Sequence, residues 1–412
     1  MQKISFRATW PAIIALAISS SVAVIAGDWR HFRGTDSNGV GDDVPAPTKF
    51  SATENIAWKV DLPGPGLSSP IIVGDRVFVT AASGYRDDRL HVLCFNVNDG
   101  TKRWERQFTA TGRTSHHEGS RQAAPTPASD GDRIFALFSS SDLICLDLDG
   151  NLEWYRGLNF EYPNASNSLG MASSPIVVGK TLVAQLENDS ESLATGIDVD
   201  TGESRWTSIR PKKSNWTSAL PWPKKFGGAE DLALLQSSEG IAAIKPMTGE
   251  VAWKYTEGAS TIPSSVVADG VIYAASHGIT ALKPNAAGNE VEQLWRTNKL
   301  GPGTGSPLVY HGRIYSINNA GVLLSADAQT GDIKWQLRIP GRFTGSPIVG
   351  GGYLYAFNET GEGHCVKLDE AKGELVSTGD IGVGKILSTP AIANGAIYVR
   401  GDTALWKIAA TP

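Results

Sequence analysis

The chain has 412 residues, among them 45 glycines and 12 tryptophans, with 19% charged residues and a formal net charge of −5. This composition is typical of many short strands joined by tight turns, and no long stretch shows helical apolar spacing, which argues against a helical protein. The acidic balance and the lack of a basic run argue against nucleic acid as a partner.

The first 26 residues are predicted to be a signal peptide. Lys3 and Arg7 precede an uncharged apolar run, and Val24 and Ala26 are small residues at the spacing that a signal peptidase reads. An uncleaved anchor is the alternative, although an apolar run interrupted by three serines is short for a membrane span. We therefore expect a periplasmic or secreted protein without a transmembrane span after cleavage.

Residues 27–54 are rich in Gly, Pro and Asp, and we expect them to form an irregular arm over one face of the following domain. From residue 55 onward the chain repeats. Five segments share a Gly followed four residues later by a Trp, namely Gly100 and Trp104, Gly150 and Trp154, Gly202 and Trp206, Gly249 and Trp253, and Gly331 and Trp335. A sixth segment, Gly288 to Trp295, carries a three-residue insertion, and Gly373 leads to Val376 where a Trp is expected.

A second marker, Ser or Thr before Pro, precedes a strand, a Gly turn and another strand in each repeat. With two degenerate copies there are eight, spaced 40 to 57 residues apart, which begin at Ser69, Thr126, Ser174, Ser218, Ser264, Ser306, Ser346 and Thr389. Each copy reads as four short strands, with glycine supplying positive φ in the turns. Four strands repeated eight times predict an all-β fold, an eight-bladed β-propeller of four-stranded antiparallel blades over residues 55–412.

The two ends of the repeat region are complementary. The last copy ends with a strand around Trp406 and lacks a fourth strand, whereas an unmatched fourth strand surrounds Trp58. Pairing the N-terminal strand with the C-terminal blade would complete that blade and remove an exposed sheet edge. We therefore predict that the ring closes in this way.

The three cysteines, Cys94, Cys145 and Cys365, occupy one repeat position on the third strand, where other copies carry Gly, Ala or Ser. Buried packing of a small side chain explains this pattern, since buried Cys behaves as a small hydrophobe. A disulfide is the alternative, and the odd count would leave at least one thiol unpaired. We expect three free, buried thiols.

The most suggestive polar cluster is His116-His117-Glu118, just before Arg121, in the widest gap between repeat markers. Adjacent histidines on an extended chain point to opposite faces, which disfavours joint metal binding. A solvated loop and a ligand contact at the channel mouth both remain open as interpretations. Further candidate ligand-binding residues flank the starts of inner strands, at Trp216, Arg342 and Lys385. No motif marks a catalytic nucleophile or a metal centre.

The run D-x-x-T-G-x-x-x-W is complete in Asp198 to Trp206 and close to complete in Asp327 to Trp335. This repeat resembles the tryptophan-docking repeat of PQQ-like, quinoprotein-type propellers, and the resemblance extends over residues 55–412. It implies that each Trp docks onto the neighbouring blade. The family includes quinoprotein dehydrogenases, which hold PQQ over Ca²⁺ at the channel mouth, and BamB-type propellers, which bind partners without a cofactor.

The dehydrogenase branch typically carries two adjacent, bridged cysteines, which this chain lacks, and the segments entering the inner strands contain no carboxylate. We therefore expect a monomeric, non-enzymatic binding or scaffolding propeller that acts in cell-envelope protein assembly, with no cofactor and with a protein or glycan partner on one face. The alternatives are a PQQ- and calcium-dependent dehydrogenase and a carbohydrate-active propeller. The choice rests on analogy, since one fold hosts many functions.

Overall fold

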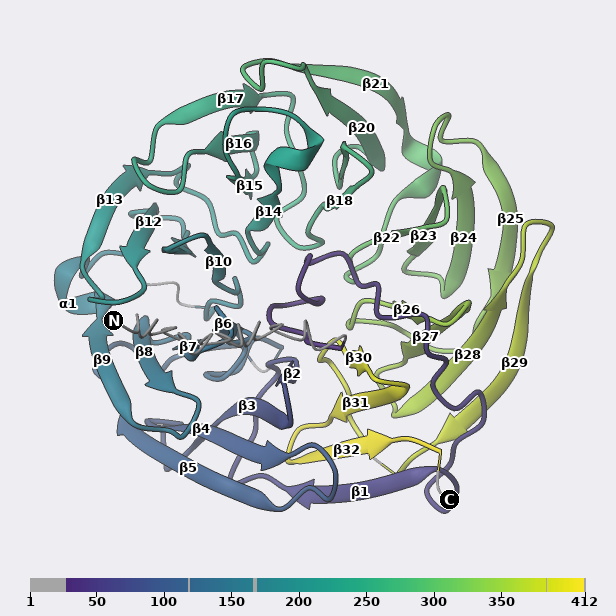
Figure 1. Cartoon of the computed structure of the whole chain (residues 1–412), viewed down its shortest axis with the longest axis horizontal. Coiled ribbons are helices and arrows are strands. Elements are labelled where there is room, and N and C mark those ends of the chain that lie inside the picture. Colours follow the sequence, from purple (N-terminus) through teal and green to yellow (C-terminus); the bar gives the residue numbers. More distant parts are fainter. Residues whose placement is uncertain (1–26, 118, 166–168, 383, 411–412) are drawn as a thin grey trace, which may run out of the picture.

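The computed structural model describes residues 27–117, 119–165, 169–382 and 384–410, and the predicted signal peptide lies outside them. The described residues form eight four-stranded antiparallel sheets arranged as blades around a central axis (Figure 1). In each blade the first strand lies nearest the axis and the fourth at the rim. The predicted all-β, eight-bladed propeller is confirmed.

The first four blades follow chain order. Blade 1 has β2 (Ile71–Val73), β3 (Arg76–Ser83), β4 (Arg89–Asn96) and β5 (Lys102–Thr109); blade 2 has β6 (Ala128–Ser129), β7 (Arg133–Leu137), β8 (Asp142–Asp147) and β9 (Leu152–Gly157); blade 3 has β10 (Ile176–Val178), β11 (Thr181–Leu186), β12 (Leu193–Asp198) and β13 (Ser204–Ile209); blade 4 has β14 (Leu220–Trp222), β15 (Leu232–Ser237), β16 (Gly240–Ile244) and β17 (Val251–Tyr255).

The other four blades continue the same order. Blade 5 has β18 (Val266–Ala268), β19 (Val271–Ala274), β20 (Ile279–Pro284) and β21 (Val291–Thr297); blade 6 has β22 (Leu308–Tyr310), β23 (Arg313–Ile317), β24 (Val322–Asp327) and β25 (Ile333–Arg338); blade 7 has β26 (Ile348–Gly350), β27 (Tyr353–Phe357), β28 (Glu362–Leu368) and β29 (Gly373–Asp380); blade 8 has β30 (Ala391–Ala393), β31 (Ala396–Arg400), β32 (Ala404–Ile408) and β1 (Ile56–Asp61). Short helical segments lie between strands: α1 (Leu158–Glu161), η1 (Lys224–Phe226) and η2 (Asn298–Leu300).

Blade 8 is assembled from both ends of the chain, as predicted. Strand β1 pairs antiparallel with β32, with Lys59 opposite Trp406 and Asp61 opposite Ala404. This pairing covers the edge that β32 would otherwise expose. The ring is therefore closed by hydrogen bonds between residues that are more than three hundred positions apart in the sequence.

Tryptophans of the outer strands join neighbouring blades. In six of them the indole Nε1 donates a hydrogen bond to a backbone carbonyl of the next blade, at 2.7 to 3.2 Å, from Trp58 to Val97, Trp104 to Leu148, Trp154 to Val199, Trp206 to Pro246, Trp295 to Ala328 and Trp335 to Asp369. Trp206 and Trp335 are each only 8% exposed. The docking of each Trp onto the adjacent blade, implied by the resemblance, is confirmed at these seams.

The glycine of the repeat makes room for the tryptophan of the preceding blade. Gly202 has a φ of 76°, which favours glycine, and a Cβ at this position would lie 2.7 Å from Trp154. The Gly and the Trp of one repeat therefore serve two different seams: the Gly receives one indole, and the Trp docks onward. This arrangement explains why the two residues keep a fixed spacing.

Two seams depart from this pattern. Blade 7 has Ser377, not a Trp, opposite Cys365, and the Trp of blade 4 lacks the hydrogen bond to a described residue. Trp253 is buried, yet its Nε1 has no hydrogen-bond partner within the described chain. The turn that it would dock onto, between β20 and β21 in blade 5, is the one lengthened by the insertion before Trp295. The longer turn therefore accompanies the loss of the indole hydrogen bond.

The cysteines lie on third strands, facing the outer-strand docking position. Cys94 pairs with Trp104 and Cys145 with Trp154, where blade 3 has Gly196 opposite Trp206. A small side chain is required there because the indole lies over it. All three cysteines are free and fully buried, as predicted.

Residues 27–54 run across one end of the ring, as the purple segment in Figure 1 shows. Trp29 pairs with Ile72 of blade 1 and Val40 pairs with Val349 of blade 7. The backbone N–H of Asn394, in the first turn of blade 8, donates to the Asp42 carboxylate at 2.9 Å. These contacts are made to two first strands and to one turn between a first and a second strand, so this segment covers that face of the propeller.

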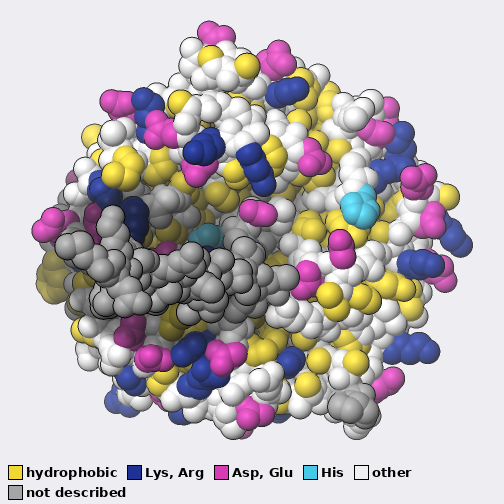
Figure 2. Space-filling model, in the orientation of Figure 1, with side chains coloured by type: hydrophobic (Ala, Val, Ile, Leu, Met, Phe, Trp, Pro, Cys, Tyr) yellow, Lys and Arg dark blue, Asp and Glu magenta, His cyan; other side chains and the backbone are white. Residues whose placement is uncertain are grey.

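Among the described residues, no helix reaches the length and apolarity needed to cross a bilayer. On the face shown in Figure 2, Lys and Arg side chains alternate with Asp and Glu around the rim. Neither sign of charge dominates that visible face.

Candidate functional site

Eight hydroxyl side chains, one at the start of each blade, form a ring around the channel. In seven successive bonds of 2.9 to 3.0 Å, the backbone N–H of one member donates to the side-chain oxygen of the next, in the order Ser69, Thr126, Ser174, Ser218, Ser264, Ser306, Ser346 and Thr389. We call these residues the hydroxyl ring. They are the Ser and Thr residues that mark the repeats in the sequence, and all are nearly buried.

The hydroxyl ring has donor capacity left toward the channel. Each oxygen that accepts a backbone N–H still carries its own proton, because a hydroxyl is both a donor and an acceptor. Within the described chain, no acceptor is seen for these protons, and all eight side chains line a central cavity of about 640 Å³. This set of donors fits a ligand group rich in hydrogen-bond acceptors.

A second ring of side chains comes from the residues two positions before each member of the hydroxyl ring in the sequence. One part of this ring is apolar and the other part is polar. Its members, all lining the same cavity, are Leu67, Ala124, Ala172, Trp216, Ile262, Thr304, Thr344 and Leu387. Six consecutive blades, from Leu387 round to Ile262, supply an apolar arc, and Thr304 and Thr344 supply a polar arc. The cavity wall is therefore amphipathic around its circumference.

The N-terminal arm forms the floor of the cavity. Phe32 lines it, and the neighbouring Arg33 is fully buried. The Arg33 guanidinium donates to the carbonyls of Ser265, at 3.1 Å, and Pro307, each directly after a member of the hydroxyl ring. The arm therefore blocks one end of the channel and leaves the other end open. We call this cavity, with its hydroxyl ring and its floor at Phe32, the cup.

Arg33 carries a buried charge without a carboxylate partner in the described chain. Burial lowers its pKa to about 9, so the guanidinium stays protonated at neutral pH. Its Nε also lacks a hydrogen-bond partner. Three backbone carbonyls, those of Asn38, Ser265 and Pro307, compensate this charge in part.

The rim of the cup carries charged side chains from loops. The Arg342 side chain is 80% exposed, and its Nε lies 3.4 Å from Glu359 Oε1. Glu359 also accepts a 2.6 Å hydrogen bond from Thr344 Oγ1. Lys385 lines the cavity and is exposed. Positive charge therefore exceeds negative charge among the described residues of the cup.

The structure brings together four of the seven candidate residues predicted from sequence, because His117, Trp216, Arg342 and Lys385 all line the cup. The Trp216 indole donates to the Gly170 carbonyl at 2.9 Å, which fixes its orientation. Arg121 instead forms a 3.3 Å ion pair with Asp402. Glu118 lies outside the described residues.

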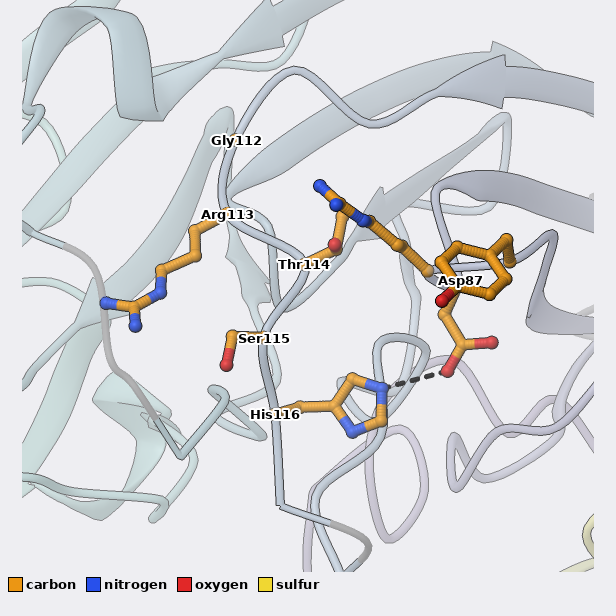
Figure 3. A pocket seen from close by; sticks show the side chains of 8 residues that line it. Asp87, Gly112, Arg113, Thr114, Ser115 and His116 are labelled. Carbon is orange, nitrogen blue, oxygen red and sulfur yellow. Dashed lines mark hydrogen bonds and ion pairs between the residues drawn. The ribbon is translucent and has the colours of Figure 1, made fainter.

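His116 lies in a separate, shallow pocket of about 670 Å³ between the loop of residues 84–88 and the segment of residues 112–116. Its Nε2 is 2.8 Å from Asp87 Oδ2, as the dashed line in Figure 3 shows. His116 and His117 thus serve different pockets, which agrees with the expectation that adjacent histidines diverge. With Nδ1 of His116 3.1 Å from the His117 carbonyl, both ring nitrogens are occupied.

The donor set of the cup does not fit a calcium-bound quinone. Ca²⁺ takes six to eight oxygen ligands, several of them carboxylates. Among the described residues lining the cup, the one carboxylate is Glu359, which already contacts Arg342 and Thr344. In the described part of the chain, no group of three or more His, Cys, Asp or Glu side chains is arranged to hold a metal ion.

Sequence reasoning missed the role of the repeat markers. The Ser or Thr before each proline was interpreted as a strand start, whereas its hydroxyl links adjacent blades and lines the cup. The signal was present, because all eight copies keep a hydroxyl residue even where proline is replaced by Ala219 or Ser265. The contribution of Phe32 and Arg33 could not be inferred, since nothing in their local sequence places them on the axis.

The fold and the cup define a tryptophan-docking, eight-bladed propeller with a channel closed at one end. A family model described as outer membrane protein assembly factor BamB matches residues 40–255 and 237–359, so the chain belongs to this PQQ-like propeller family. No curated protein matches the chain.

Solved structures of similar fold include both branches of the family. A europium-containing methanol dehydrogenase has a TM-score of 0.71 at 13% identity, over 92% of this chain and 90% of the other. BamB from Moraxella catarrhalis has a TM-score of 0.61 at 15% identity, over 85% and 96%. Quinohemoprotein alcohol dehydrogenase from Comamonas testosteroni has a TM-score of 0.65 at 13% identity, over 94% and 81%. At these identities the likeness shows the fold alone.

Proposed function

We propose that the chain is an exported, non-enzymatic binding or scaffolding propeller that acts in the assembly of cell-envelope proteins. The observation that carries this proposal is the cup itself. It is a hydroxyl-lined cavity closed by Phe32, with an amphipathic wall and a cationic rim. Such a site can hold a partner by shape and hydrogen bonding.

The family model supports the setting of this proposal, because its description refers to an outer membrane assembly factor. Export would follow from the predicted signal peptide in residues 1–26, and residues 27–412 would then form the mature, monomeric protein, with the arm and the propeller together. The partner would be a protein bound at the open end of the cup. The arm would leave that end accessible, since it covers the opposite face.

The second candidate function is that of a PQQ-dependent dehydrogenase, favoured by the likeness to the methanol dehydrogenase structure. Titration of the purified protein with PQQ, in the presence of Ca²⁺ or a lanthanide, separates the two. We expect no tight binding and no dye-linked oxidation of methanol or sugars. Micromolar or tighter binding with turnover would replace the first proposal with the second.

Export is tested separately by fusing residues 1–26 to alkaline phosphatase, which is active only outside the cytoplasm. The matched control replaces Lys3 and Arg7 with Glu, because signal peptides require a positively charged start. We expect phosphatase activity from the native fusion and a marked loss in the control. An inactive native fusion would contradict an exported location.

A further inference from the structure

We infer that the cup binds the C-terminal end of an apolar peptide, with its free carboxylate near the hydroxyl ring and its side chains on the apolar arc. This inference rests on the proposed binding function and adds the chemistry of the partner. Three properties of the cup lead to it: the sign of its charge, the split character of its wall and its closed floor.

The charge of the cup selects an anion. Arg342 and Lys385 lie at the rim, whereas buried Arg33 lies beneath the ring, outside the cavity lining, and donates to backbone carbonyls. The described lining offers one carboxylate, Glu359, which is paired with Arg342, so Lys385 is the lining cation that forms no ion pair with a described residue. The whole chain is acidic, with a formal charge of −5, so this positive site is a local feature. Arg342 and Lys385 can form charge-assisted hydrogen bonds with a carboxylate, and Arg33 contributes through its electric field alone.

The apolar arc of the wall favours a ligand that has an apolar part next to its carboxylate. Ile262 is 50% exposed and Leu169 is 45% exposed, and both line the cup beside Trp216. Large aliphatic side chains left open to solvent at a cavity mouth mark a binding surface. The aromatic face of Trp216, held by its bond to Gly170, adds a rigid apolar contact.

Because its floor is closed, the cup favours binding of the end of a peptide over binding of an internal segment. Because Phe32 blocks the channel, an extended segment can enter the cup but cannot pass through it. The free protons of the hydroxyl ring can bond to the terminal carboxylate and to the last backbone carbonyls, which a peptide presents at every residue. A cavity of about 640 Å³ is within the ordinary size of ligand pockets and holds a short terminal segment.

The experiment measures binding of a fluorescent pentapeptide of Leu and Phe residues, labelled at its N-terminus, to the full mature protein. The free acid is compared with the C-terminal amide, and octanoate is used as a competitor. We expect the free acid to bind at least ~10-fold more tightly than the amide, because charge-assisted hydrogen bonds are lost with the carboxylate. Equal binding of acid and amide would overturn the inference. Displacement by octanoate at the affinity of the peptide would also overturn it, since a simple carboxylate would then suffice.

Variants locate the site. The double variant Arg342→Gln, Lys385→Gln should weaken binding of the free-acid peptide by roughly 10-fold and leave binding of the amide unchanged. The matched control, Arg338→Gln with Lys372→Gln, removes two exposed charges away from the cup and should have no effect. Ile262→Ser, at a half-exposed side chain, should weaken both peptides without unfolding the protein. Equal effects of the cup and control variants would refute the location. Tight PQQ binding with turnover would instead remove the proposed function on which the inference rests.

Discussion

The seams between blades make a quantitative prediction possible, because the chain contains a bonded and an unbonded version of one contact. Trp206 and Trp253 are both buried, at 8% and 4% exposure. The Trp206 Nε1 donates to the Pro246 carbonyl at 2.7 Å, whereas the Trp253 Nε1 has no partner in the described chain. Replacing each with Phe keeps an aromatic ring and removes the indole N–H.

The two substitutions should therefore lower the free energy of unfolding by different amounts. Trp206→Phe removes a buried hydrogen bond and leaves the Pro246 carbonyl without that donor, at a cost of about 1–3 kcal/mol. Trp253→Phe removes a buried donor that is already unsatisfied, which offsets the loss of ring volume. Because the volume change is shared, Trp206→Phe should be more destabilising by about 1–3 kcal/mol.

The assay combines urea unfolding with amide hydrogen exchange at the affected seams. Exchange is needed because repeat proteins lose stability partly blade by blade, so the global midpoint can conceal a local change. A suitable probe is the Gly249 amide, which is bonded to the Lys245 carbonyl beside the Trp206 docking site. Equal destabilisation by the two variants would refute the reasoning that the Nε1 bond stabilises the seam.

Three further predictions concern the ring, its thiols and its arm. A chain that starts at residue 66 lacks β1 and should lose cooperative unfolding or aggregate, because β32 then exposes its edge; unfolding like that of the mature chain would contradict closure. A thiol reagent should label no cysteine in the native protein and three after denaturation without reductant, since burial raises the pKa of Cys94 to about 12; fewer than three would reveal a disulfide. Burial lowers the pKa of His31 in the arm to about 4, below its unfolded value of 6.5, so its neutral form is favoured by folding. The resulting stability is complete above pH 6.5 and falls by about 1.4 kcal/mol per unit as the pH drops towards 4. Arm proteolysis should therefore accelerate between pH 6.5 and 4.5 and do so less in His31→Gln, whereas exposed His277→Gln should behave as the native chain.

The repeat architecture could be predicted from the sequence because its markers recur in every blade. The Gly and Trp spacing reports contacts at the seams, and the marker at Ser69 and its equivalents reports the start of each inner strand. The missing fourth strand near Trp406 also predicted closure correctly. Each of these features is local in sequence and repeated, so its meaning survives without knowledge of the tertiary structure.

The cup was only partly predictable, because it forms where eight distant segments meet. Residues flanking inner strands, such as Trp216, Arg342 and Lys385, could be chosen from their register in the repeat. His116 could not be separated from His117, because the side that each faces depends on contacts to Asp87 and to the axis. Arg33 is held by carbonyls more than two hundred residues away, and no local pattern encodes that contact.

The closure of blade 8 imposes an order on folding. Strand β1 is made first and β32 last, so β1 has no partner until nearly the whole chain has been synthesised. Contacts between such distant segments carry a large loop-closure cost and form late. Blades 1 to 7 can each form from local hairpins in the meantime, while β1 remains an unpaired edge open to aggregation. We therefore expect the capture of the first strand by the last to be a late step of folding, and a factor that shields β1 until then to raise the yield of the native ring.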